Sequence, residues 1–266
     1  MGVRRHPFVR NGVVLGALAG VLALAGCGGE AQGKAAAANP TLVYPNALTV
    51  CSDVPYKPFE FVRAGVTVGF DVDIAQTVAD ELEVRLDIVD VSFEEITSGS
   101  ALNAGTCDMA ISSITITGDR ARVVDFSSQY FEAHQVLMAP AGSGIEGLSD
   151  AAGKRIFVQN GTTGASYLRQ HAPLGTKITF VGDFEVAKAA AQRGDADAIV
   201  ADNMVAASVT KQSGFKAVEA FTGGEQYGIA VKKDGNAELL RVINRVMAEI
   251  REDGRYDSIY ETWFGK

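Results

Sequence analysis

Short apolar runs alternate along the chain with segments in which apolar residues recur at helical spacing. In the segment after Gly69, for example, Ile74, Val78 and Leu82 stand four residues apart and would share one face of a helix. Regular alternation of this kind predicts parallel strands joined by crossover helices, which is an α/β layer architecture. The apolar runs predict strands at 47–52, 86–91, 109–111, 135–138, 155–158, 178–181, 198–200 and 227–231. The helical spacing predicts helices at 74–82, 93–103, from about 165, and at 184–192, 204–212, 239–250 and 256–263.

The stretch from Cys107 to Arg120 joins one of these strands to candidate chemistry. Its apolar half is followed by four hydroxyl side chains and then by an arginine; the hydroxyls are Ser112, Ser113, Thr115 and Thr117. Thr117 is a favourable N-cap, which predicts a helix from about Gly118 with Arg120 in its first turn. Hydroxyls, backbone N–H groups and a guanidinium at a strand end suit the binding of a small carboxylate. The alternative is that the hydroxyls only cap a helix and that Arg120 lies on a solvated face.

The N-terminal segment has the pattern of a processing signal rather than of a folded element. Three arginines precede an apolar run at 13–25 that is too short to span a bilayer stably. The run ends in Leu24-Ala25-Gly26-Cys27, which resembles a bacterial lipobox. The resemblance implies a signal peptide over 1–26, cleavage before Cys27 and lipid on its thiol. An ordinary secretory signal with a chance cysteine is the alternative. Residues 27–40 are rich in Gly and Ala and are predicted to be a flexible tether.

Composition narrows the classes of function that the chain can have. It has 266 residues, of which 47% are hydrophobic, and a net charge of −8. An acidic chain of this kind without a lysine-rich patch argues against nucleic acid as a partner. His134 and His171 stand alone, and no nucleophile elbow or phosphate loop is present. We therefore assign no catalytic residue, no metal site and no cofactor.

The two cysteines of the body, Cys51 and Cys107, allow two interpretations. An even number of cysteines outside the cytosol favours a disulfide. Both residues also lie in or beside predicted strands, where buried free thiols are common.

Five pieces in this order resemble the bacterial family of extracellular solute-binding proteins that deliver polar amino acids to ABC importers. The pieces are 52–61 (SDVPYKPFEF), 69–73 (GFDVD), 107–127, 158–163 (VQNGTT) and 254–265. The resemblance covers the chain from about Leu42 to its end. It implies a two-lobe, periplasmic-binding-protein-like (type II) α/β fold, in which each lobe has a mostly parallel sheet flanked by helices and two hinge strands join the lobes. Lobe 1 would comprise 39–131 and 224–266, and lobe 2 would comprise 132–223.

The resemblance also implies where the protein acts and what it contacts. It would be an extracytoplasmic monomer, lipid-anchored to the cell membrane. Its partners would be a free amino acid and the permease of an ABC transporter. The ligand would bind in the crevice between the lobes, at the carboxyl ends of the strands.

Roles for individual residues follow from the same resemblance. Arg120 would bind the α-carboxylate of the ligand, and Asp202 would accept its α-ammonium. Tyr56 and Phe93 would sandwich its side chain, and Asp53 would read the far end. The complete expected ligand-binding set is Asp53, Tyr56, Phe93, Ser112, Ser113, Thr115, Arg120, Gln159, Thr162, Thr163 and Asp202.

Simpler interpretations of four of these residues stay open on the sequence alone, and one of them is that Tyr56 belongs to the core. Asp202 could only cap the helix that follows it, and Asp53 could only close a turn before Pro55. Gln159 could face solvent. Phe59, although it is in the first matching piece, is predicted to belong to the core.

The identity of the ligand follows from Asp53. A carboxylate facing aromatic rings suits a guanidinium, an ammonium or an amide. We therefore expect arginine or another basic amino acid, and after these the neutral amide glutamine. Two other classes are possible on this scaffold: an exported dehydratase acting on a cyclic amino-acid precursor, with Glu94 or Glu95 as general acid, and the sensory domain of a larger receptor.

Overall fold

The computed structural model describes residues 40–211, 214–221 and 223–265. The expected signal peptide 1–26, the lipid-bearing Cys27 and all of the expected tether except its last residue lie outside this part of the chain. In the described residues, no helix combines the length and the hydropathy that a membrane span requires.

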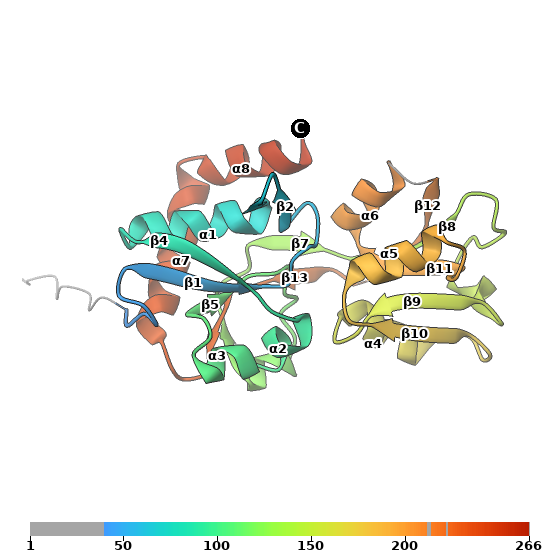
Figure 1. Ribbon diagram of the computed structural model, residues 1–266, viewed down its shortest axis with the longest axis horizontal. Coiled ribbons are helices and arrows are strands. Elements are labelled where there is room, and N and C mark those ends of the chain that lie inside the picture. Colours follow the sequence, from blue (N-terminus) through green and yellow to red (C-terminus); the bar gives the residue numbers. More distant parts are fainter. Residues whose placement is uncertain (1–39, 212–213, 222, 266) are drawn as a thin grey trace, which may run out of the picture. The chain divides into compact units, whose positions relative to one another are not determined.

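Two five-stranded sheets form the framework, and each combines parallel with antiparallel pairs (Figure 1). The first has the order β4-β1-β5-β14-β6, with strands Arg85–Asp90, Ala47–Ser52, Met109–Ala110, Ala230–Lys232 and Val124–Phe126. The second has the order β10-β9-β11-β8-β12, with strands Lys177–Val181, Arg155–Gln159, Ala198–Asp202, Gln135–Pro140 and Phe215–Ala220. We call the parts that carry these sheets lobe 1 and lobe 2.

A separate pair of strands connects the lobes. The chain leaves the first sheet through β7 (Phe131–Ala133) and returns to it through β13 (Glu225–Tyr227). These two strands pair antiparallel, with Glu225 opposite Ala133. They occupy the positions in the chain that the two expected hinge strands would have, whereas the exact lobe boundaries stay a prediction.

Helices cover both faces of the first sheet. The longer ones, α1 (Phe70–Glu81), α7 (Ala237–Glu252) and α8 (Arg255–Phe264), contact one another on one face. The predicted stripe of α7 is confirmed, because Leu239, Ile243, Val246 and Ile250 are all buried. Complete burial of one such side chain stabilises a fold by about 1.5–3 kcal/mol. The other face carries α2 (Phe93–Thr97) and α3 (Ser100–Ala104). A short β2–β3 hairpin (Phe61–Arg63 and Val66–Val68) precedes α1 and contacts α8, where the Phe61 ring packs on Trp263.

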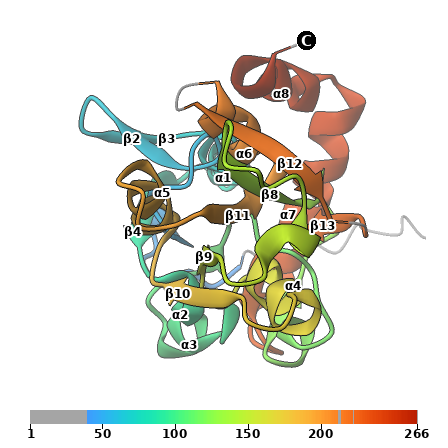
Figure 2. The same ribbon diagram turned by 90° about the vertical axis from the view of Figure 1, so that its right-hand side faces the viewer.

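Alternation along the strands of lobe 2 determines which helix packs on which face of its sheet (Figure 2). In β11, Ala198 and Val200 pack in one hydrophobic cluster with α4 (Thr163–His171). Ile199 and Ala201 pack in another with α5 (Phe184–Gln192) and α6 (Asn203–Thr210). Successive side chains of a strand point to opposite faces, so a continuous apolar run predicts a strand buried on both sides.

Three expectations about local structure need correction. The helix predicted from Gly118 is only a 3₁₀ turn, Arg120–Arg122, because the chain enters β6 at Val124. The helix predicted over 93–103 is two short helices separated at Gly99, which has a φ of +73°. The hairpin of β2 and β3, and strand β12, were not predicted at all.

Candidate functional site

All eleven residues expected to bind a ligand line a single cavity between the lobes, and Gln135 lines it with them. Asp53, Tyr56, Phe93, Ser112, Ser113, Thr115 and Arg120 come from lobe 1, and Gln135, Gln159, Thr162, Thr163 and Asp202 come from lobe 2. Asp53, Ser112, Gln159 and Asp202 stand at or just after the carboxyl ends of parallel strands. Gln135 opens an antiparallel strand and pairs in register with Asp202, so it reaches the same edge.

Arg120 is buried at this cavity and does not lie on a solvated face. Its side chain is 7% exposed. Nη1 donates to the Thr115 carbonyl at 2.8 Å, and Nη2 donates across the cleft to the Gly161 carbonyl at 2.9 Å. The hydroxyl of Thr117 accepts the backbone N–H of Arg120 at 3.2 Å, so the expected cap acts on the 3₁₀ turn. Burial lowers the pKa of Arg120 to about 10, and the side chain is therefore a cation at neutral pH.

Asp202 ends β11 and occupies the N-cap position of α6, but its side chain does not cap that helix. Its carboxylate instead accepts hydrogen bonds from the Tyr56 hydroxyl and from the Gln135 amide. Burial, and then the charge of Glu225, raise the pKa of Asp202 to about 7, although the hydrogen bonds from Tyr56 and Gln135 oppose the shift. The simple capping interpretation of Asp202 is therefore wrong.

Asp53 and Gln159 meet across the cleft. The Gln159 amide donates to Asp53 Oδ2 at 2.5 Å and to the Gly182 carbonyl at 3.2 Å. Gln159 is 5% exposed, so the interpretation that it faces solvent is wrong. Burial raises the pKa of Asp53 to about 6, and the Gln159 hydrogen bond opposes this shift.

Two aromatic side chains complete the walls. The Phe93 ring lies 5.1 Å from the guanidinium carbon of Arg120, a cation–π distance. The Tyr56 ring packs edge-on against Phe184 of lobe 2 at 5.7 Å. As expected, Phe59 behind Tyr56 belongs to the core and is fully buried.

The start of α4 presents hydroxyls and backbone N–H groups to the cavity. Thr162 is its N-cap and accepts the Ala165 N–H at 3.0 Å, and the helix begins at Thr163. The unpaired N–H groups of a helix start favour an anionic ligand.

Side chains from the two lobes nearly fill the enclosed part of the cleft, whose volume is about 20 Å³. That volume suits a water molecule rather than an amino acid. A wider, open cavity of about 820 Å³ adjoins it and shares Arg120, Gln135, Thr162 and Thr163 with it. The enclosed part, as it stands in this structure, is therefore too small for an amino acid.

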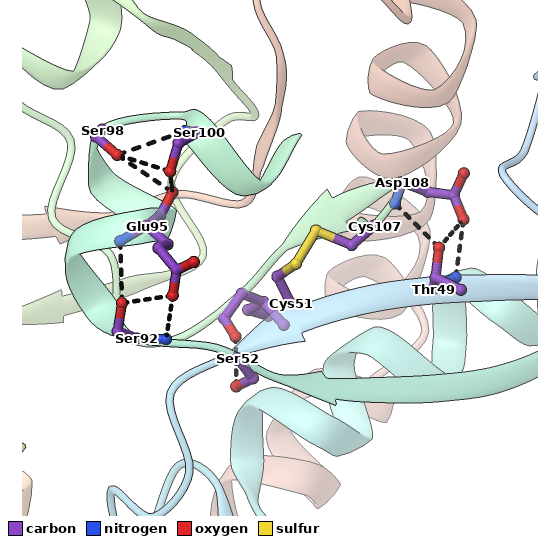
Figure 3. Close-up of a disulfide and its surroundings, with 10 residues drawn as sticks. Thr49, Cys51, Ser52, Ser92, Glu95, Ser98, Ser100, Cys107 and Asp108 are labelled. Carbon is purple, nitrogen blue, oxygen red and sulfur yellow. Dashed lines mark hydrogen bonds between the residues drawn. A yellow bond between two sulfur atoms is a disulfide. The ribbon is translucent and has the colours of Figure 1, made fainter. Parts of the chain in front are cut away.

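Cys51 and Cys107 form a disulfide in lobe 1 (Figure 3), so the first of the two interpretations of these cysteines is confirmed. The disulfide ties β1, which leads to Asp53, to the segment that leads to Ser112. Beside it, Thr49 donates through its backbone N–H and its hydroxyl to Asp108 Oδ2, at 2.8 and 2.6 Å. The two strands are therefore joined covalently and by buried hydrogen bonds.

Four polar residues around the cleft were not predicted as part of the site: Gln135, Glu225, Glu60 and Asp71. Gln135 donates to Glu225 Oε2 at 3.2 Å, and Thr115 donates to the same atom at 2.7 Å. Glu60 and Asp71 stand inside two of the matching sequence pieces, which is a signal that could have identified them. No group of histidine, cysteine and acidic side chains suited to a metal ion occurs in the part of the chain that the structure describes.

Comparison with known proteins adds to this geometry. The sequence profile of the bacterial extracellular solute-binding proteins, family 3, matches residues 48–266. The chain belongs to this family. It is 33% identical over 255 residues to a probable histidine-binding protein of Neisseria gonorrhoeae, a match that covers 92% of each chain. It is 33% identical over 205 residues to the ABC transporter glutamine-binding protein GlnH of Bacillus subtilis (strain 168), covering 75% of this chain and 74% of the relative.

A solved structure gives the same result for the fold. An ancestral arginine-binding protein bound to arginine has a TM-score of 0.77 and 39% identity, with 83% of this chain and 99% of that one covered. The two-lobe, type II α/β fold expected from the sequence is therefore confirmed. Family members of this kind are amino-acid-binding proteins of ABC transporters and not enzymes, and membership places the protein outside the cytoplasm.

Proposed function

We propose that this protein is a receptor that binds one free polar amino acid between its two lobes: a basic one, with arginine first, or else glutamine. The observation that carries the proposal is a pair of opposite charges at one cavity. Arg120 comes from lobe 1 and Asp202 from lobe 2, and both line it. A zwitterion has one anionic and one cationic group. Transfer of both groups from water into the protein is favourable when each one meets a side chain of opposite charge.

Each lobe alone would bind half of this ligand. Arg120 would grip the α-carboxylate with help from Thr115, from the Ser112–Ser113 turn and from the start of α4. Asp202 would accept the α-ammonium. Closure of the lobes would complete the site, so that ligand binding and domain movement are coupled.

The preference for a basic ligand rests on Asp53. Its carboxylate lines the same cavity as Tyr56 and Phe93 and accepts the Gln159 amide. A guanidinium could replace that amide as donor and stack between the two rings, which supports arginine. The side-chain amide of a glutamine ligand could also replace the Gln159 amide as donor to Asp53, although it carries no positive charge. The relatives named for histidine, glutamine and arginine are consistent with a ligand of this class.

The remaining parts of the proposal concern delivery. The receptor would act as a lipid-anchored monomer, held to the membrane through Cys27 and the tether 27–40, and would pass its ligand to an ABC permease. The lipobox-like residues before Cys27 support the anchor. Mass spectrometry of protein from a bacterial host should find a diacylglyceryl-modified Cys27, and an unmodified N-terminus would exclude the anchor.

Isothermal titration across the twenty amino acids tests the ligand, and Arg120→Ala tests the site. Two charge-assisted hydrogen bonds to a carboxylate contribute about 1.5–3 kcal/mol each, so the variant should lose at least about 100-fold in affinity. Arg122→Ala is the matched control, because Arg122 stands in the same turn with its side chain 73% exposed. Unchanged affinity in Arg120→Ala would refute the site, and tight binding of glutamate without a response to arginine would refute the ligand.

A further inference from the structure

Two acidic side chains lie fully buried beside the site, and neither has a role in the ligand contacts proposed above. Glu60 and Asp71 are each 0% exposed. The backbone N–H of Asp71 donates to the Phe59 carbonyl at 3.0 Å, which brings the start of α1 against the segment that carries Glu60. Gly69 permits this approach, because a Cβ at that position would lie 1.9 Å from the same carbonyl oxygen. The path of the backbone therefore brings Glu60 and Asp71 close to each other.

Each acid holds one residue of the Ser112–Ser113 turn, which lines the cavity. Glu60 Oε1 accepts the Ser112 hydroxyl at 2.5 Å. Asp71 Oδ2 accepts the backbone N–H of Ser113 at 2.7 Å and the Tyr130 hydroxyl at 2.9 Å. Ser113 has a φ of +49°, which is a left-handed conformation that residues other than glycine rarely adopt. The bond to Asp71 fixes this turn in a conformation that its own backbone disfavours.

The second oxygen of each carboxyl group has no donor among the described residues: Glu60 Oε2 and Asp71 Oδ1 are both buried and unpaired. The charged groups that act on the pair are acidic, namely Asp53 and Asp202, and the titratable groups around it are the phenols of Tyr56, Tyr130 and Tyr256. The positive charge of Arg120 interacts instead with the charges of Glu225 and Asp202. Two adjacent buried carboxylates that are both ionised would be very unfavourable.

A single proton would remove this difficulty, because it would leave only one negative charge on the two neighbouring acids. The hydrogen bonds indicate which acid holds it. Asp71 accepts two donors, which favour its ionised form, whereas Glu60 accepts one. Burial, and then the charge of Asp71, raise the pKa of Glu60 well above its usual range. Burial raises the pKa of Asp71 to about 7, against the opposing effect of its two hydrogen bonds.

We propose that Glu60 and Asp71 share one proton, held mainly on Glu60, and that the pair in this form positions the Ser112–Ser113 turn for the ligand. Both are positioning residues, because they touch the turn and not the ligand. The effect on the ligand rests on the function proposed above, whereas the shared proton does not.

Carbon-13 NMR of the side-chain carboxyl groups tests the proton directly. The measurement uses the Asp202→Asn protein, in which the other strongly buried acid of the cleft cannot contribute a neutral-acid signal. At pH 8, where Asp71 should be mostly ionised, we expect one neutral carboxyl resonance from glutamate, which disappears when Glu60→Gln is added. In Asp71→Asn the amide can donate to Glu60, so the same resonance should become that of a carboxylate. Carboxylates alone at pH 8, or a neutral glutamate resonance that survives Glu60→Gln, would overturn the proposal.

Arginine titrations of three proteins, the wild type and two variants, test the positioning. In Glu60→Gln the new side-chain amide can accept from Ser112 and donate to Asp71 as a neutral acid does, so this variant should bind within about threefold of the wild type. Glu60→Ala supplies neither bond and should lose at least tenfold. Equal losses in both variants, or no loss in Glu60→Ala, would overturn the positioning role. If Glu60→Ala does not fold, Glu60→Gln still decides, since a tenfold loss there contradicts the neutral acid. A wild-type protein that binds no amino acid would refute the proposed function. The carbon-13 spectra would still test whether Glu60 and Asp71 share a proton.

Discussion

The affinity of this protein for its ligand should fall steeply as the pH is lowered from 8 to 5. The reason is that Asp202, the proposed acceptor of the ligand's α-ammonium group, must be ionised to pair with that group. Burial raises the pKa of its carboxyl to about 7, so most of the protein is competent at pH 8 and about 1% is competent at pH 5. The apparent dissociation constant rises in proportion as the competent fraction falls. We therefore expect a loss of about 100-fold over this range from Asp202 alone.

The far end of the ligand adds a second, ligand-specific component. Burial raises the pKa of Asp53 to about 6, so at pH 5 only about a tenth of it is ionised. A guanidinium needs that charge and an amide does not. Between pH 8 and pH 5, arginine should therefore lose about 1,000-fold in affinity and glutamine about 100-fold.

Isothermal titration at half-unit intervals of pH, with two buffers of different ionisation enthalpy to count protons, measures both slopes. Asp202→Asn should bind weakly at every pH and should lose the common slope. Asp195→Asn, a change at an exposed acid of lobe 2 whose side chain is 57% exposed, should leave the slopes unchanged. A wild-type dissociation constant that varies by less than about threefold from pH 8 to pH 5 would refute the role given to Asp202.

Three further predictions concern stability. In Asp202→Asn, the free energy of unfolding should exceed that of the wild type at pH 8, and the difference should vanish near pH 4. A carboxyl whose pKa is raised by folding weakens the fold progressively as the pH climbs from its unfolded value toward about 7, and denaturant titration at both pH values checks the sign. Replacing both Cys51 and Cys107 with alanine opens a covalent loop with a sequence separation of 56 and should cost about 4 kcal/mol in the same assay, whereas a loss below about 1 kcal/mol would contradict the chain-entropy argument. Gly69→Ala would force a Cβ to within 1.9 Å of a backbone carbonyl and should cost about 3 kcal/mol or more; Gly65→Ala, with a similar sign of φ but open space, should cost only about 1–2 kcal/mol, and equal losses would show that the close approach does not matter.

The sequence predicted the alternating framework because its causes are local. Ala198 to Val200 and Phe184 to Gln192 indicate a buried strand and an amphipathic helix within a few residues of their own sequence. The charged site residues were found because polar side chains that follow such strands collect at one edge of the sheet, and because family motifs surround Arg120.

What was missed depends on contacts between distant residues. Gln135 reaches the site only because β8 runs antiparallel to β11, and Glu225 reaches it only through the pairing of β13 with β7. Neither register can be read from the neighbouring residues. The complete burial of Glu60 is also contrary to its residue type, so composition and periodicity point away from it.

The proposed ligand would compete with hydrogen bonds that the protein already makes inside the cleft. Asp53 and Asp202 already receive hydrogen bonds from Gln159, Gln135 and Tyr56. Binding of the proposed ligand would then be a substitution, in which an incoming donor replaces an internal one and the number of hydrogen bonds changes little. Selectivity under such an exchange depends on charge and fit more than on bond count. Gln159 thus competes with a cationic ligand for Asp53, and the same hydrogen bond keeps the pKa of Asp53 lower and its carboxyl group more ionised.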